Sequence, residues 1–314
     1  MPHQYRKQPL SSAEMLALLK SRNLLIPNED RATRYLDSIG YYRLSGYMYP
    51  LQSADRTHRF AKGTRFDDIV HAYKFDKRLR AIVMEYMERV EVVLRAKMTN
   101  YYSLEYGFFW YTDENLIDRK YKGQWQGLLD QLQENFKLPK ELFLKTFKRN
   151  YPDEPFPPSQ MALETLSLGE LARLFRALLT DKPKLQIAAE FRQAPATLDT
   201  WFIWLANVRN ICAHHGRLWN RIMSADRPNI PGRKDFKFPV PMPEDANTTM
   251  YGAVALIDHL LKCFNPGNHF TEQVENLIRE YQVNATLMGF PAKWEETAVW
   301  HYEKEPRTPG NPSR

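Results

Sequence analysis

The feature that most restricts the fold is a long run of helical periodicity between residues 66 and 102. Its apolar side chains recur every three or four residues, which places on one helix face Leu79, Ile82, Val83, Tyr86, Val90, Val93 and Leu94. The charged residues on the other side are Arg80, Glu88, Glu91 and Arg95. We expect one long helix, or two with a break. Its charged face is more commonly a solvated surface than a wall of an active site, and an exposed pair such as Glu91 with Arg95 contributes only about 0.3–0.5 kcal/mol.

The rest of the sequence also favours helices over sheets. Glycine is scarce, at 13 residues, and no stretch alternates convincingly between apolar and polar residues over the length of a strand. Two capping-box spacings, Ser11 with Glu14 and Ser167 with Glu170, precede apolar stripes. Further helices are expected over residues 28–39, 123–137, 197–216, 248–264 and 271–287. With 43% apolar and 26% charged residues, the chain is expected to be a soluble all-α protein.

We expect three parts along the chain. Residues 1–65 form an N-terminal helical and aromatic extension, residues 66–290 a helical domain, and residues 291–314 a C-terminal tail whose end is disordered. In the extension, residues 40–52 are rich in tyrosine and predict an irregular connection or a short hairpin. Aromatic core packing and a surface that stacks RNA bases explain these tyrosines equally well. An irregular insertion or mobile flap is expected at about 104–160, where helix is excluded by the prolines at 152, 155, 157 and 158.

Composition excludes several classes of protein. The net charge of +7 favours a polyanion partner without requiring one. Two cysteines, Cys212 and Cys263, allow no disulfide framework and have no paired zinc spacing, so a reducing cytoplasm is expected. The N-terminus lacks the apolar core of a signal peptide, and no run approaches the roughly 18 apolar residues of a membrane span. We predict a cytoplasmic protein with no membrane segment, no metal and no other cofactor.

The segment RNICAHH, residues 209–215, concentrates polar groups at the end of an apolar helix. On a helical wheel Asn207, Asn210 and His214 fall within about 60°, away from the core face, whereas Arg209 points about 140° from His214. Gly216 is expected as the helix C-cap. This would place both histidines in the last turn, where the helix dipole favours an imidazolium.

Several chemical interpretations of this segment can be compared. Metal binding is disfavoured, because adjacent histidines point in different directions and no HExxH or CxxC accompanies them. A nucleophilic Cys212 would have to leave the apolar face on which its helical angle places it. A purely structural role, in which arginine and histidine cap a helix end, is ordinarily the commoner explanation for a pattern as short as R-x4-H.

The wider sequence favours a catalytic role for this segment over a purely structural one. The arrangement R-N-x-x-x-H resembles the signature of HEPN ribonucleases. Five segments resemble, in this order, the Abi-like abortive-infection family of the AbiD and AbiF group. They are "LLKSRNLLI", "YLDSIGYYRLSGYMYP", "FDKRLRAIVMEYMERVEVVLRA", "ALETLSLGELARLF" and "LANVRNICAHHGRLWNR". The resemblance covers roughly residues 8–222 and implies an all-α, HEPN-type helical bundle.

The resemblance implies a metal-independent endoribonuclease whose active site forms where two motif helices meet across a homodimer. It implies a role in bacterial anti-phage abortive infection or in a toxin–antitoxin arrangement. Some relatives are partnered with a structured non-coding RNA, so an RNA antitoxin or guide is an expected partner besides the RNA substrate. In such a dimer the arginine of one chain can approach the histidine of the other, which accounts for the angle of Arg209.

The residue types fit RNA cleavage, because RNA supplies its own nucleophile, the 2′-OH. His214 is assigned as acid and base, Arg209 as phosphate clamp and Asn210 as the residue that orients His214 or the phosphate. His215 is the alternative base, since HEPN motifs tolerate a longer spacer. Supporting roles are expected for Arg80, Glu88, Glu91, Arg95 and Asn207, and RNA contacts for Arg217, Arg221, Arg233, Lys234, Tyr41, Tyr42 and Arg43. The alternative function is a non-catalytic RNA-binding or scaffolding protein in which the motif is structural.

Overall fold

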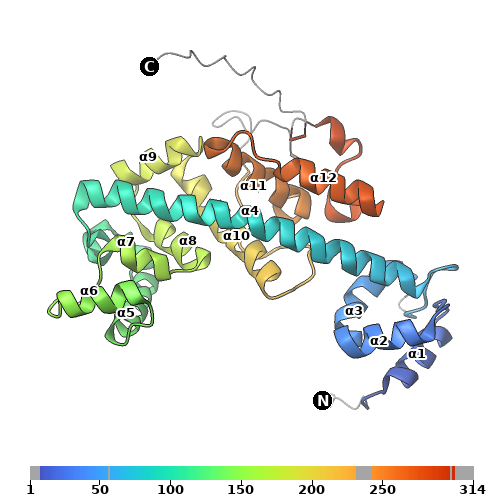
Figure 1. The fold of residues 1–314 in the computed structure, drawn as a ribbon. Helices are drawn as coiled ribbons and strands as arrows, with labels where there is room; N and C mark the ends of the chain where they lie inside the picture. Colours follow the sequence, from blue (N-terminus) through green and yellow to red (C-terminus); the bar gives the residue numbers. More distant parts are fainter. Residues whose placement is uncertain (1–7, 56, 231–241, 298, 301–314) are drawn as a thin grey trace, which may run out of the picture.

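The computed structural model describes residues 8–55, 57–230, 242–297 and 299–300. These residues form α-helices joined by short 3-10 turns and loops, without a β-strand, so the all-α prediction is confirmed (Figure 1). The helices are α1 (Ser12–Ser21), α2 (Glu29–Ile39), α3 (Tyr41–Met48), α4 (Phe66–Tyr106), α5 (Lys122–Lys137), α6 (Leu142–Asn150), α7 (Ser159–Ala162), α8 (Leu168–Ala177), α9 (Lys182–Glu190), α10 (Pro195–Ala213), α11 (Met250–Phe264) and α12 (Phe270–Tyr281).

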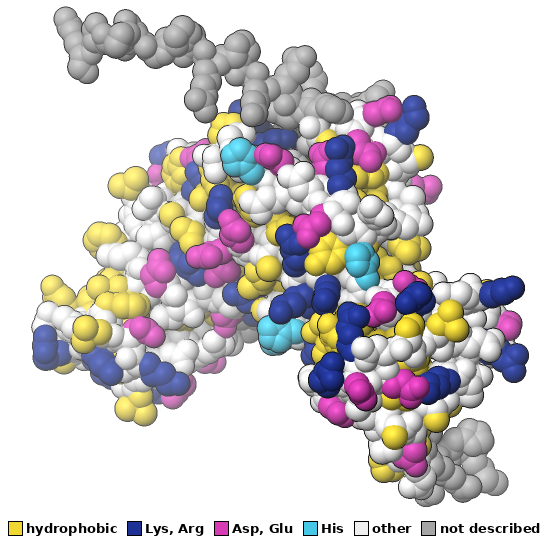
Figure 2. Space-filling view, turned by 45° about the vertical axis from the view of Figure 1, so that its right-hand side comes forward, with side chains coloured by type: hydrophobic (Ala, Val, Ile, Leu, Met, Phe, Trp, Pro, Cys, Tyr) yellow, Lys and Arg dark blue, Asp and Glu magenta, His cyan; other side chains and the backbone are white. Residues whose placement is uncertain are grey.

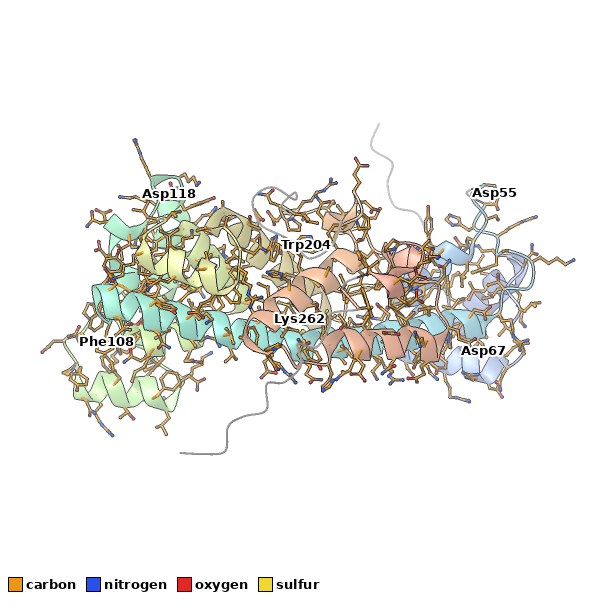
Figure 3. All side chains as sticks on the ribbon, turned by 90° about the horizontal axis from the view of Figure 1, so that it is seen from above. Asp55, Asp67, Phe108, Asp118, Trp204 and Lys262 are labelled. Carbon is orange, nitrogen blue, oxygen red and sulfur yellow. The ribbon has the colours of Figure 1, made fainter. Side chains whose placement is uncertain are left out.

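Helix α4 is one unbroken helix of 41 residues and forms the axis of the molecule. Helices α9, α10, α11 and α12 pack along it, while α3 packs near its beginning and α7 and α8 near its end. Seen from above, α11 and α12 run beside it (Figure 3). Helices α1–α3 form a lobe at one end of α4 and α5–α8 a lobe at the other (Figure 1). Because other helices cover α4 on several sides, its buried residues are not confined to one stripe.

The prediction of a solvated charged face on α4 is therefore wrong. Arg80 is 6% exposed and forms an ion pair with Asp76, one turn earlier. The side chains of Glu91 and Arg95 are 14% and 12% exposed. Of the four charged residues singled out on this face, Glu88 alone is exposed. The apolar period of the sequence locates the core contacts but does not show that charged side chains are covered as well.

Residues 41–48 form α3, not the irregular connection or hairpin predicted from their tyrosines and glycines. Leu44, Tyr47 and Met48 are buried at the three- and four-residue spacing of a helix. Their burial against α4 outweighs the weak local propensity of aromatic residues and glycine for helix. All eight residues of α3, Tyr42 among them, lie in the segment for which the sequence predicts an irregular connection or a hairpin.

Several local predictions are confirmed. Both capping boxes are present, with Glu14 accepting from the Ser11 backbone N–H at 2.7 Å and Glu170 from that of Ser167 at 2.8 Å. Helix α5 matches the helix expected over 123–137. The proline-rich segment before α7 is not helical, and its Pro157 carbonyl accepts a hydrogen bond at 2.6 Å from the buried Tyr111 hydroxyl.

The helix expected over 271–287 ends early. Helix α12 stops at Tyr281, and the next residue, Gln282, has the left-handed backbone conformation with φ +47°. A 3-10 turn, Ala285–Met288, follows. The apolar residues beyond Tyr281 thus continue the buried surface without continuing the helix.

A buried carboxylate lies in α11. Asp258 is 4% exposed, and its Oδ2 lies 2.6 Å from the Nζ of Lys262. Its Oδ1 accepts no hydrogen bond from the described residues. Burial raises the pKa of Asp258 to about 6, against the opposing effect of Lys262.

Asp258 is expected to make stability depend on pH. The folded chain holds this proton more tightly than the unfolded chain, whose carboxyl has a pKa near its ordinary value of about 4. Stability should therefore fall as the pH rises from about 4 to about 6. Asp258→Asn should remove this decrease and raise the free energy of unfolding at pH 7, by at most about 3 kcal/mol. Urea unfolding across this pH range measures both effects. The exposed Asp153→Asn is the control, and a decrease that persists in Asp258→Asn would contradict the assignment.

Candidate active site at the end of helix α10

The motif residues lie at the exposed end of a deeply buried helix. Trp201, Phe202, Trp204 and Leu205 are fully buried in the first half of α10. The far end of the helix emerges between the lobe of α1–α3 and the lobe of α5–α8 (Figure 1). Figure 2 shows that this underside is hollowed, and that Lys and Arg side chains gather beside a histidine at its top. The core thus presents the motif in a concave, basic region.

Helix α10 ends earlier than its sequence suggests. Its last residue is Ala213, His214 is the C-cap and His215 takes the left-handed conformation with φ +56°. The N–H of His215 donates to the Cys212 carbonyl at 2.9 Å, and the N–H of Gly216 to the Ile211 carbonyl at 2.7 Å. These two bonds form a Schellman motif. The predictions that Gly216 is the cap and that both histidines belong to the last turn are therefore wrong.

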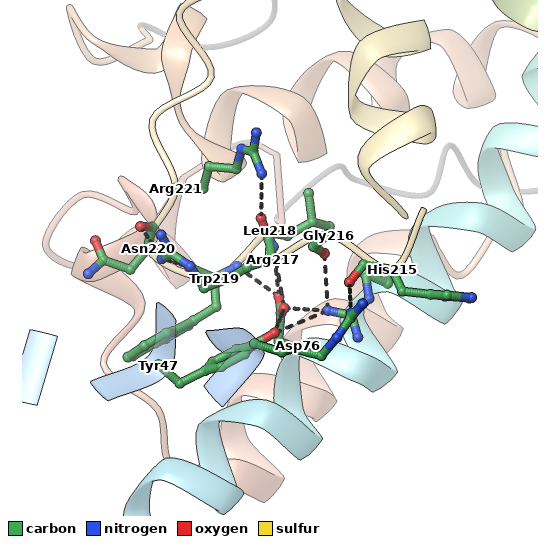
Figure 4. A network of polar contacts seen from close by, with 11 residues as sticks. Tyr47, Asp76, His215, Gly216, Arg217, Leu218, Trp219, Asn220 and Arg221 are labelled. Carbon is green, nitrogen blue, oxygen red and sulfur yellow. Dashed lines mark hydrogen bonds and ion pairs between the residues drawn. The ribbon is translucent and has the colours of Figure 1, made fainter. Parts of the chain in front are cut away.

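Position 216 is crowded, and its backbone does not have the left-handed angle that favours glycine. A Cβ on Gly216 would lie 3.1 Å from both the Ile211 carbonyl oxygen and its Cγ2. The left-handed position falls instead to His215, where a side chain costs about 1–2 kcal/mol. Both histidine side chains are exposed, and the His215 ring points away from the polar network beneath it (Figure 4).

Arg209 is held by the residue beside it and by α4. One of its terminal nitrogens donates to the Asn210 Oδ1 at 3.3 Å, and the other lies 3.7 Å from the Glu91 Oε2. The Asn210 side chain therefore orients Arg209. The backbone carbonyl of Asn210 accepts a hydrogen bond from the His214 N–H at 3.0 Å. This is a backbone bond of the helix and not a side-chain contact between the two residues.

Glu91 is shared by two arginines. Its Oε1 accepts from Arg95 at 2.9 Å, while its Oε2 faces Arg209. Arg95 also donates to the carbonyls of Leu163 and Leu166, each at 2.9 Å, and so fastens α4 to the segment before α8. The predicted supporting residues Glu91 and Arg95 thus fix the position of the motif arginine, whereas no described contact joins the exposed Glu88 to the motif.

A carboxylate missed in the sequence, Asp76, organises the loop after the motif. It is completely buried and accepts from the Tyr47 hydroxyl at 2.6 Å, from the backbone N–H groups of Leu218 and Trp219 at 3.1 and 2.7 Å, and from Arg80 (Figure 4). Burial raises the pKa of Asp76, and these donors oppose that shift. Burial and the nearby Asp76 charge also raise the pKa of Tyr47. The one sequence signal for a role of Asp76 is its position one helical turn before Arg80.

Two arginines complete this clamp by binding carbonyls. Arg80 donates to the Gly216 carbonyl at 3.2 Å, and Arg43 of α3 donates to the His215 carbonyl at 2.5 Å. The loop from His215 to Trp219 is therefore bound by residues from α3 and α4. We call Tyr47, Asp76, Arg80 and Arg43 together the clamp.

The other predicted RNA-contacting residues have diverse surroundings. Arg217 is half-buried and donates to the carbonyls of Trp219 and Asn220 at 2.6 and 2.5 Å, and burial lowers its pKa. Arg221 is exposed, with one nitrogen 3.5 Å from the Arg217 carbonyl. Arg233 and Lys234 lie outside the described residues. Of the two described arginines, Arg221 extends into solvent while Arg217 holds the loop.

The predicted polar residues around the motif do not all converge on it. Asn207 donates to Asp226 at 3.0 Å, in the loop beyond the motif, instead of meeting His214. Tyr41 accepts from Arg22 at 3.2 Å, and Tyr42 is 93% exposed. The three residues predicted to share one polar face therefore do not meet. Asn207 contacts Asp226, Asn210 contacts Arg209, and His214 lies beyond the last helical residue.

Cys212 and the other potential metal ligands of the described residues bear on alternative chemistry at this site. Cys212 is buried, and burial raises the pKa of its thiol to about 12, so it carries no thiolate at neutral pH. Within the described residues, no three His, Cys, Asp or Glu side chains are grouped so that they could hold a metal ion. The same residues include no helix long and apolar enough to cross a membrane.

Comparison with known proteins identifies one relationship. A family model described as Abi-like protein matches residues 34–220, which include α3, α4, α10 and the motif. No match to the chain was found among curated proteins or among solved structures.

The clamp gives a prediction for stability. Asp76→Asn leaves the buried Arg80 without its counter-charge and places an amide donor among other donors, so we expect unfolding to become easier by about 3–5 kcal/mol. Asp67→Asn on the same helix breaks the exposed pair of Asp67 with Arg31, at 2.8 Å, and should cost less than about 1 kcal/mol. Urea unfolding compares the two variants. In hydrogen exchange, the Leu218 and Trp219 amides should lose protection in Asp76→Asn. Equal effects of the two variants would refute the clamp.

Proposed function

Because the chain belongs to the Abi-like protein family, we propose that it is a HEPN-type endoribonuclease of bacterial anti-phage defence. It acts through abortive infection or as the toxin of a toxin–antitoxin pair in the cytoplasm. The observation that carries the proposal is the arrangement of Arg209, Asn210 and two exposed histidines at one helix end, in a hollow with a basic surface. RNA is its substrate, and a structured RNA is a second, restraining partner.

The proposed reaction needs only a proton shuttle and a cation. The 2′-OH of RNA attacks the adjacent phosphorus, the 5′-oxygen of the next nucleotide leaves, and a 2′,3′-cyclic phosphate forms. His214 moves the protons, with His215 as the alternative, because an imidazole can both accept and donate a proton. The Arg209 guanidinium neutralises the charge on the phosphate oxygens. Asn210 and Glu91 orient that guanidinium, as their contacts with it support.

We further propose that two chains complete the site. Within one chain Arg209 is directed towards Glu91 on α4, whereas both histidines stand beyond the end of the helix. Packing two α10 ends against each other would bring the arginine of one chain near the histidine of the other. The exposure of this helix end supports such a contact.

Substitution of the motif tests the proposed catalysis. We expect Arg209→Ala to lower the cleavage rate of single-stranded RNA by about 10²–10⁴-fold. The same loss is expected from His214→Ala or from His215→Ala, depending on which ring is the base. The exposed His269→Ala is the matched control and should cleave normally. Cleavage should persist in EDTA and leave 2′,3′-cyclic or 3′-phosphate ends, which RNA end analysis detects. Folding is checked by circular dichroism. Wild-type protein that binds RNA without cutting it would support the alternative, a non-catalytic RNA-binding or scaffolding protein.

Mixing two inactive variants tests the composite site. Arg209→Ala retains its histidines and His214→Ala retains its arginine, so a mixed dimer contains one intact pair across the interface. We expect activity to return when the two proteins are mixed, unfolded and refolded together, and sedimentation to show a dimer. Each single variant, unfolded and refolded alone, contains no intact pair and is the control. Failure of complementation in a proven mixed dimer would place the whole site in one chain.

A further inference from the structure

Helix α3 touches the motif although it is far from it in the sequence. Arg43 donates one N–H to the His215 carbonyl at 2.5 Å, across 172 residues of chain. The Arg43 side chain is nevertheless exposed. A guanidinium has five donors in a rigid plane, so this single bond fixes its orientation and leaves the others free. A permanent positive charge is therefore held against the His215 backbone by a residue outside the motif.

Next to Arg43 stands the most exposed large apolar side chain in the described residues, Tyr42, which is 93% exposed. Tyr42 lies one helical turn before Gly46, on the same side of α3. Gly46 is packed against Arg217, since a Cβ there would lie 3.2 Å from the Arg217 Nε. The side of α3 that bears Tyr42 therefore borders the loop that follows the motif, and its ring covers no protein surface.

The clamp keeps α3 in this place. Tyr47, on the same helix, donates to Asp76, and Asp76 binds the loop at Leu218 and Trp219. The Tyr47 ring also stacks on that of Trp219, with ring centroids 6.2 Å apart. The backbone of α3 at Tyr42 and the Arg43 guanidinium are therefore held in place relative to His215 before any ligand binds, which lowers the entropy cost of binding.

We propose that Tyr42 and Arg43 form a subsite for the nucleotide that flanks the cleaved bond. Tyr42 stacks on its base, and Arg43 binds its phosphate through the donors left free by His215. The inference rests on the proposed cleavage of RNA. An aromatic ring accepts any base, so this subsite contributes affinity and position without choosing a sequence. It also gives the N-terminal lobe a part in substrate binding.

The subsite is tested with the full chain and a short single-stranded RNA carrying 2′-O-methyl groups, which cannot supply the nucleophile. Fluorescence anisotropy measures its binding, with an abasic residue moved through each position in turn. For wild type, one position should weaken binding by about 10-fold when its base is removed. Tyr42→Ala should bind about 10-fold more weakly and should no longer respond at that position, whereas Tyr42→Phe should behave like wild type. The control Tyr49→Ala removes a ring that is 74% exposed just beyond the other end of α3.

Cleavage kinetics separate this role from a structural one. Tyr42→Ala should raise KM and leave kcat and the urea unfolding curve unchanged, because its ring contacts solvent. Arg43→Gln should also weaken RNA binding, and Arg43→Lys should restore it only in part, because a lysine is a single point charge. If RNA binds wild type, Tyr42→Ala and Arg43→Gln equally, the subsite is refuted while the proposed function stands. If wild type neither binds nor cleaves RNA, the proposed function itself fails.

Discussion

The buried carboxylate of Asp76 is the constraint on which the arrangement of the candidate site depends. Removing a carboxylate from water is expensive, and it is tolerated where several donors converge on it. Here the donors come from α3, from α4 and from the loop after α10. One group therefore joins three parts of the chain that are far apart in sequence. Asp76 holds the loop directly at Leu218 and Trp219, and Arg80, which it binds, holds the Gly216 carbonyl.

A second ion pair on α4, partly buried, acts in the same way on the motif arginine. Glu91 shares its two oxygens between Arg95 and Arg209, and Arg95 is anchored by the Leu163 and Leu166 carbonyls. Helix α4 thus carries both acidic residues that position the motif. An unbroken helix sets the distance between them, because they lie 15 positions apart on a rigid rod. This is a physical reason for α4 to be a single long helix.

These contacts connect the family assignment to a proposed mechanism. Arg209 is oriented by Asn210 and Glu91, and the histidines are exposed beyond the end of the helix. A polyanion that enters the hollow would meet fixed cations and free imidazoles without rearranging the core. The proposed subsite on α3 extends the same logic, since Arg43 is fixed by His215 while its remaining donors stay free. Rigid positioning of this kind is what catalysis by a small number of side chains requires.

The sequence by itself determined the all-α class, the helical character of the segment that begins at residue 66, both capping boxes and the core face of α10. These features depend on side-chain periodicity and on contacts within four residues, which are read directly along the chain. Only the tertiary structure decided that residues 41–48 are helical and that His215, not Gly216, takes the left-handed position.

The tertiary structure also decided which polar residues meet at the site. Asp76 reaches Leu218 across 142 residues, and no local pattern records such a pairing. Glu91 and Arg95 had the spacing of an exposed pair, yet other helices cover them. A buried charge needs partners from several segments to offset its desolvation, and those segments are brought together only when the chain folds.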